Sequence, residues 1–178
     1  FPTFPSDPEA YLRIYPEIKL AEEQKQAWFA DRAGALVGRA IADLYGWKVG
    51  DQVPLRSAIW RRMDGSDTWD VTVRAIYDLP EGGDTRQIVL HQDYFEEAKS
   101  VGKGLVGWYL VQIEDPNRAA PVSRQIDLLF ANSPAETKTS SERAMAQSFV
   151  NQVGNIGKIL GAIVTAVFFT MLLVTANT

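Results

Sequence analysis

Residues that could carry out chemistry are few in this chain of 178 residues. His91 is its only histidine, and it has no cysteine. Disulfides, thiolate metal sites and a cysteine nucleophile are therefore excluded within it. A lone histidine at the end of a strand-like segment is typical of a surface residue or a hydrogen-bonded one, and we do not assign His91 to catalysis.

Acidic residues occur in three pairs, at Glu22/Glu23, Asp64/Asp67 and Glu96/Glu97. Each pair falls on an expected helix surface or in a turn, where solvation is the ordinary role. Glycosidase chemistry would require two carboxyl groups held across a cleft. The glycines at 82–83 and 102–104 lack the full phosphate-loop patterns, so we interpret them as turns. The sequence predicts no catalytic, cofactor-binding or metal-binding residue, and it does not predict an enzyme.

The charge balance argues against nucleic acid as a partner. The chain has 22 acidic and 18 basic residues, a net charge of −4, and no run of five or six Lys or Arg. Binding to phosphates requires a concentrated basic patch, and none is visible here.

The C-terminal residues 159–178 form an uncharged apolar run, ILGAIVTAVFFTMLLVTANT. A run of about 18 residues or more can cross the hydrocarbon core of a bilayer as a helix. All Asp and Glu lie at or before Glu142, and Lys158 is the only charge after Arg143. These features predict a transmembrane helix over 158–178, with Lys158 at its water-facing end. The alternative is a buried helix of a soluble protein, but such helices usually have one polar face.

Three small residues, Gly157, Gly161 and Thr165, follow one another at four-residue intervals in this run. Small residues on one face of a membrane helix allow a second helix to approach closely. We therefore predict that these three positions pack against another helix in the membrane.

A helix is expected to begin at Ser140 or Ser141 and to continue without a strong breaker into the apolar run. It would extend from about residue 142 to residue 175, a length of about 50 Å. Residues 142–157 would form a stalk, with Glu142, Phe149 and Lys158 as its mechanical positions. Without a flexible linker, such a helix would couple the preceding domain mechanically to the membrane.

The domain that precedes this helix alternates short strands and helices, which predicts an α+β fold. Residues 69–77 alternate apolar and polar side chains, as in a strand with one buried face, and should pair antiparallel with the strand before it. Residues 38–45 should form a helix that ends at Gly46 and buries Ile41, Leu44 and Tyr45. Further helices are expected at 7–15, 20–31, 92–99 and 116–131, and further strands at 35–37, 86–91, 108–114 and 136–140.

The strand, helix and strand expected over 108–140 form a split β-α-β unit, which is half of a ferredoxin-like sandwich. The segment ALVGRAIADLYGWKVGDQVPL (35–55), followed by WDVTVRAIYD (69–78), resembles the extracytoplasmic core domain of MacB/FtsX-type ABC transporter permeases. Asp93-Tyr94-Phe95, the segment WYLVQIE (108–114) and the SPAETKT phrase (133–139), which leads into the membrane helix, fit the same family. The resemblance covers nearly the whole chain and includes no catalytic signature.

The resemblance implies a porter-like α/β layer with a small β-rich inserted subdomain. The periplasmic core domain would occupy 1–141, with the insert at about 34–99 and the β-α-β porter half at about 105–141. The stalk (142–157) and the second transmembrane helix (158–178) would follow. We expect the chain to be part of a longer permease with four membrane helices.

The implied function is to couple ATP hydrolysis in the cytoplasm to substrate export or extraction, by mechanotransmission through the stalk. No cofactor is expected in this chain, because ATP would be used by a separate ATPase subunit or domain. The implied partners are that ATPase, a second permease copy, the lipid bilayer of the inner (plasma) membrane and a periplasmic adaptor. The alternative is a membrane-anchored extracytoplasmic binding module without a transport role.

Overall fold

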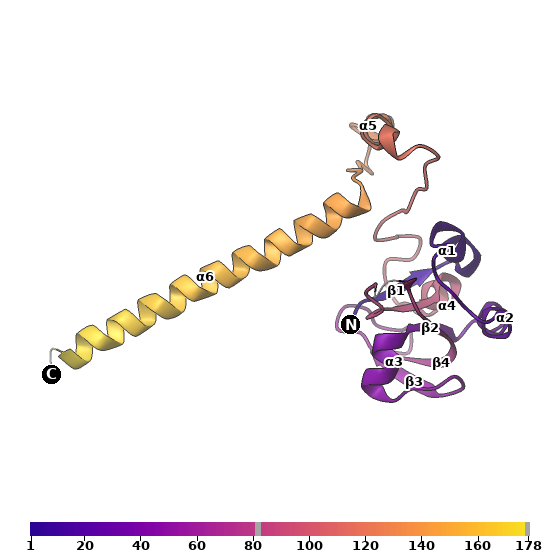
Figure 1. Cartoon of the computed structure of the whole chain (residues 1–178), viewed down its shortest axis with the longest axis horizontal. Coiled ribbons are helices and arrows are strands. Elements are labelled where there is room, and N and C mark those ends of the chain that lie inside the picture. Colours follow the sequence, from indigo (N-terminus) through magenta and orange to yellow (C-terminus); the bar gives the residue numbers. More distant parts are fainter. Residues whose placement is uncertain (81–82, 177–178) are drawn as a thin grey trace. The chain divides into compact units, whose positions relative to one another are not determined.

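The computed structural model describes residues 1–80 and 83–176, and for part of the last helix it describes the backbone alone. The chain divides into two compact units, Phe1–Val111 and Gln112–Thr178. Each unit is described by itself below (Figure 1).

The described part of the first unit is a mixed sheet covered by helices. Its elements, in chain order, are β1 (Thr3–Ser6), α1 (Pro8–Ile14), α2 (Glu22–Ala30), β2 (Gly34–Gly38), α3 (Arg39–Tyr45), β3 (Gln52–Arg56), β4 (Thr68–Tyr77), β5 (Ile88–His91) and α4 (Gln92–Ala98). The five strands lie in the order β1-β5-β2-β4-β3. The α+β fold expected from the sequence is confirmed at the level of a mixed sheet combined with helices.

Both parallel and antiparallel pairs occur in the sheet. Strand β1 is parallel to β5, and β2 is parallel to β4, while β5 pairs antiparallel with β2. The antiparallel pairing of β3 with β4 confirms the prediction for these neighbours. Because β1 joins β5, the sheet extends beyond the β-rich segment 34–99 that the family resemblance outlined.

Strand β4 changes its buried face part-way along. Trp69, Val71 and Val73 pack in one core cluster, but Ala75 and Tyr77 pack in the other. The pairing with β2 shifts register between Ala35 and Leu36, which face Val73 and Ala75. One extra residue in β4 is therefore accommodated as a β-bulge, and it turns the later side chains to the opposite face of the sheet. The predicted single buried face is wrong for this reason.

The two faces of the sheet are covered by different helices. Helices α3 and α4 contribute Ile41, Ala42, Tyr94 and Phe95 to the first cluster. Helices α1 and α2 contribute to the second cluster, whose centre is Trp28, a side chain with 0% exposure. The first unit therefore buries apolar side chains on both faces of one sheet, and this burial is the dominant source of its stability.

The ends of two helices agree with the sequence. The Asp7 side chain accepts a hydrogen bond from the Ala10 backbone at 2.7 Å and caps α1, with Pro8 in the first turn. Gly46 ends α3 in the left-handed conformation, with φ of 70°. However, Leu44 is 71% exposed, so the buried face predicted for α3 holds at Ile41 but not at Leu44 or Tyr45.

The described part of the second unit is helical. It contains a short 3₁₀ turn, η2 (Pro116–Arg118), followed by α5 (Ala119–Phe130) and α6 (Glu142–Ala176). Helix α6 is one 35-residue element whose bounds are close to those expected from the sequence. The separation of this helix into a stalk (142–157) and a membrane part (158–178) stays a prediction.

The strands predicted at 108–114 and 136–140 are wrong: neither segment is a strand, so the β-α-β unit over 105–141 is not formed. The Thr139 backbone N–H donates to the Asp127 side chain at 2.7 Å, which satisfies it without a neighbouring strand. Within the described residues, no strand is paired with 108–114, and the sheet ends at β1 and β3. A strand requires a hydrogen-bonded neighbour, and β propensity alone does not supply one.

Candidate functional site

The three small residues predicted for helix packing lie on one face of α6. A Cβ atom added at Gly157 or Gly161 would meet nothing within 4 Å, so this face is open within the described residues. The Thr165 hydroxyl donates to the Gly161 carbonyl at 2.8 Å and is satisfied inside the helix. These residues therefore form a strip of small side chains along α6, and their packing against another helix stays a prediction.

The start of α6 is fixed by Ser141. Its hydroxyl accepts a hydrogen bond from the Ala144 backbone at 3.2 Å, and its carbonyl accepts from the Met145 backbone at 3.0 Å. Glu142 then lies in the first turn, where a carboxylate is favoured by the helix dipole.

Two of the predicted stalk residues, Phe149 and Lys158, belong to α6 by their backbone. Their side chains lie outside the described residues. The stalk prediction therefore stands on the helix itself and not on contacts of these side chains.

Large apolar side chains are exposed along the second half of α6. Leu160, Ile163, Val164, Phe168 and Met171 are each more than half exposed. Among the residues that the structure describes, no helix combines the length and apolar character needed to cross a membrane.

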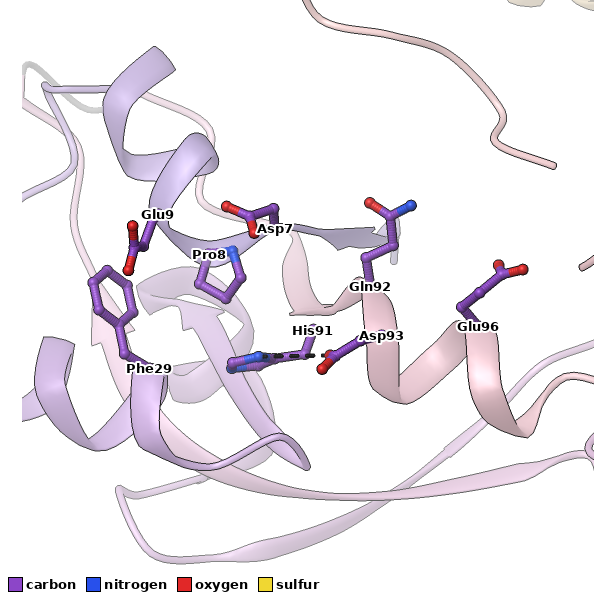
Figure 2. Close-up of a pocket in the computed structure, with 8 residues that line it drawn as sticks. All are labelled: Asp7, Pro8, Glu9, Phe29, His91, Gln92, Asp93 and Glu96. Atoms are coloured by element: carbon purple, nitrogen blue, oxygen red, sulfur yellow. Dashed lines mark ion pairs between the residues drawn. The ribbon is translucent and has the colours of Figure 1, made fainter. Parts of the chain in front are cut away.

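The first unit contains a cleft of about 500 Å³ between α1, α2 and the start of α4 (Figure 2). Its rim is acidic, and its lining residues are Asp7, Pro8, Glu9, Phe29, His91, Gln92, Asp93 and Glu96. Among the described residues that line the cleft there is no serine, threonine or cysteine, so these residues offer no hydroxyl or thiol nucleophile. Within the described part of the chain, no three His, Asp or Glu residues are grouped so that they could hold a metal ion.

His91 is fixed in this cleft by one hydrogen bond. It is 5% exposed, and its Nε2 lies 2.7 Å from the Trp28 carbonyl oxygen. Because a carbonyl oxygen only accepts, Nε2 is the donor of this hydrogen bond, and the other ring nitrogen is Nδ1. That atom lies 4.0 Å from Asp93 (Figure 2). The expectation of a hydrogen-bonded histidine is met, but His91 is buried and does not lie on the surface.

The acidic rim of the cleft is partly neutralised by Arg32. Its guanidinium lies 2.9 Å from Asp93 and 2.9 Å from Glu97. Burial opposes ionisation of Asp93, but hydrogen bonds from the Tyr94 backbone and from Arg32 outweigh it, so the pKa of Asp93 is lowered. A paired, ionised carboxylate of this kind is not poised to act as a general base at neutral pH.

Lys99 is the residue that sequence reasoning missed. It closes α4 and is 1% exposed, although Gln92 and the residues after it were expected to form an ordinary surface helix. The only signal in the sequence was the aromatic pair Tyr94-Phe95 on the same short helix. Such a pair predicts that one face of the helix packs against the core, but not that a lysine lies on that face.

No family model matches this chain, and no curated protein matches it.

Proposed function

We propose that this chain is the extracytoplasmic domain and the following membrane helix of a permease subunit of a MacB/FtsX-type ABC transporter. In this proposal it is not an enzyme by itself. A cytoplasmic ATPase hydrolyses ATP, and the helix passes the resulting motion to the domain, which exports or extracts a substrate. The observation that carries the proposal is α6, a single uninterrupted helix of 35 residues.

Two properties of α6 support this role. Its charged residues end at Lys158, and everything after that residue is uncharged, as expected for a helix that passes from water into lipid. The described helix contains no proline, so its hydrogen-bond ladder is not interrupted where the two environments would meet. An unbroken helix transmits axial and bending motion, whereas a flexible linker would dissipate it.

The proposal places the body outside the inner membrane and includes further partners. A second permease copy would pack against the strip of Gly157, Gly161 and Thr165, and a periplasmic adaptor would contact the body. In the complete transporter, residues 105–141 would belong to the porter-like layer.

The membrane position of α6 can be mapped by single-cysteine labelling, because the chain has no native cysteine. Ser148→Cys and Thr165→Cys each introduce one thiol at little change in volume. In vesicles that contain the full chain, a membrane-impermeant maleimide should label position 148 and not position 165. Both should be labelled after detergent solubilisation. Equal labelling at both positions before detergent would refute the membrane assignment.

The coupling role can be tested with two prolines in the first half of α6, Phe149→Pro and Gln152→Pro. Each removes a backbone hydrogen bond and costs about 3 kcal/mol in a helix interior. The double variant should still assemble with the ATPase but should lose transport-linked activity in cells that lack the native chain. The matched control is alanine at both positions, which removes the same side chains and preserves the helix.

Normal activity in the double-proline variant would contradict coupling through α6. It would favour the alternative of a binding module that the helix merely tethers. Loss of activity in the alanine control would instead assign the effect to the side chains of Phe149 and Gln152.

A further inference from the structure

A buried lysine lies where the chain leaves the first unit. Lys99 Nζ is 2.5 Å from the Glu96 carboxylate and 3.1 Å from the Leu105 carbonyl oxygen. Its side chain is 2% exposed, whereas that of Glu96 is 28% exposed. A buried ammonium is costly unless it is paired and hydrogen-bonded, and here both conditions are met.

Two aromatic rings complete the surroundings of this ammonium. Lys99 Nζ lies 5.4 Å from the centroid of the Trp60 ring and 5.7 Å from that of Phe95. These rings meet edge to face at 5.8 Å. Their faces attract a cation, and they exclude water from the Lys99–Glu96 pair.

The turn at residues 102–105 is built around the same group. Gly102 adopts a φ of 70°, and the Gly104 backbone N–H donates a short hydrogen bond to Glu96. The Leu105 backbone N–H closes the turn on the Gly102 carbonyl at 3.1 Å. Glu96 therefore holds both the lysine and the turn, while Lys99 holds the far end of the turn through Leu105.

The end of α4 is also tied to the connection between β3 and β4. The Met63 backbone N–H donates to the Ala98 carbonyl at 2.8 Å, and the Ser100 backbone N–H donates to the Arg61 carbonyl at 2.8 Å. Arg62 and Lys99 form an isolated antiparallel bridge at this point. The buried lysine is thus anchored to the sheet through a strand connection and through its own helix.

Beyond Leu105 the chain is held much less. Within the described residues, 106–114 makes no backbone-to-backbone hydrogen bond, and Trp108 contacts the sheet through one ring contact with Phe4 at 5.5 Å. Tyr109 is 80% exposed. The covalent path from the first unit to the second runs through this segment, whatever the arrangement of the two units.

We propose that Glu96, Lys99 and residues 102–105 form a clamp that fixes the exit of the chain to α4 and to the β3–β4 connection. Force that reaches the first unit through the chain is first resisted at this clamp. The existence of the clamp is independent of transport; its role in carrying load rests on the proposed function. Residues 106–114 are the flexible part of this connection, and the clamp is the point at which the chain becomes firmly attached to the first unit.

The test is hydrogen exchange, followed by mass spectrometry, on the full chain in detergent micelles. Lys99→Met keeps an unbranched side chain between Trp60 and Phe95 but removes the ammonium. Amides of residues 100–105 should then exchange at least about tenfold faster, because hydrogen bonds to a charged group are lost. Amides of β4 should exchange at the native rate.

Lys103→Met is the matched control, because Lys103 is exposed and lies on the same turn. It should leave exchange at 100–105 unchanged. Glu96→Gln is a second variant, which keeps the lysine and weakens its partner, and it should accelerate exchange at Gly104.

Native exchange at 100–105 in Lys99→Met would overturn the clamp. Equal acceleration of amide exchange at 100–105 and in β4 would also overturn it, because that result would make Lys99 an ordinary core residue. Because this readout does not involve transport, it is separable from the test of α6. If the double-proline variant is active while the exchange result holds, only the proposed function fails.

Discussion

Gly38 should be among the positions of the sheet least tolerant of substitution. It ends β2, directly before α3, and its Cα faces the backbone of residue 85. A Cβ atom at this position would lie 1.9 Å from the Thr85 carbonyl oxygen, although real Cβ contacts are essentially never under 3.0 Å. Gly38→Ala therefore requires β2 and the segment before β5 to move apart by more than about 1 Å.

The cost of that movement can be worked from the hydrogen bonds at the junction. The Gly38 backbone N–H donates to the Gln87 carbonyl at 3.0 Å, and the Ala40 backbone N–H donates to the Thr85 hydroxyl at 3.0 Å. Overpacking costs about 1–3 kcal/mol. Weakening two such hydrogen bonds in a largely buried place costs about 1 kcal/mol each. We expect Gly38→Ala to lower the free energy of unfolding by about 3–5 kcal/mol.

Urea unfolding of the full chain in mild detergent, followed by tryptophan fluorescence, measures this change. All five tryptophans lie in the first unit, so the signal reports on the sheet. The control is Gly46→Ala, where the added methyl group meets nothing within 4 Å but φ is 70°. Only the conformational penalty of about 1–2 kcal/mol should appear there. A Gly38→Ala variant no less stable than Gly46→Ala would refute the packing argument.

Two further predictions concern the second core cluster and the acidic cleft. Trp28→Ala should destabilise the chain by about 3–5 kcal/mol, because a fully buried indole is lost. Trp108→Ala is the control and should cost much less, because the Trp108 ring is half exposed. Equal urea midpoints for the two variants would contradict this prediction. Despite the opposing effect of burial, hydrogen bonds from Tyr94 and Arg32 lower the pKa of Asp93 in the folded chain. Its stabilising effect is therefore present above an unfolded pKa of about 4 and is lost as the pH falls through the lower folded value. Asp93→Asn should make the acid-induced loss of stability below about pH 4 shallower, and an unchanged pH profile would count against the Arg32 pair.

Most helices and strands of the first unit could be predicted, because their signals are local. Asp7 before a proline caps α1, and Gly46 ends α3. The alternation over β4 identified its buried residues, from Trp69 to Tyr77. Each of these signals depends on a residue and its near neighbours along the chain.

The division of those buried residues between two faces of the sheet could not be predicted. It depends on a bulge opposite Ala35 and Leu36, which is a property of the pairing between β2 and β4. Arg74 lies at the bulge and pairs with Asp31 at 2.7 Å. An alternating sequence is compatible with a regular strand and with a bulged one, so the choice is made by the neighbouring strand.

The buried state of Lys99 could not be predicted for a related reason. Its partner Glu96 is local, but the rings and the carbonyl that make burial tolerable come from Trp60 and Leu105, on different segments. A lysine on a short amphipathic helix is ordinarily solvated. Burial is favourable here only because three separate segments meet at one point.

Residues 108–114 show most clearly that local sequence signals do not suffice to predict a strand. The sequence WYLVQIE has strong strand propensity, yet the segment is not a strand, and Tyr109 and Val111 are largely exposed. Strand propensity measures how well side chains fit a pleated surface, but the backbone gains its hydrogen bonds only from a neighbour. Exposed apolar side chains next to unpaired backbone groups favour association with another strand. The clamp at Lys99 would hold one end of this segment fixed during such pairing, which lowers the entropy lost when its first hydrogen bonds form.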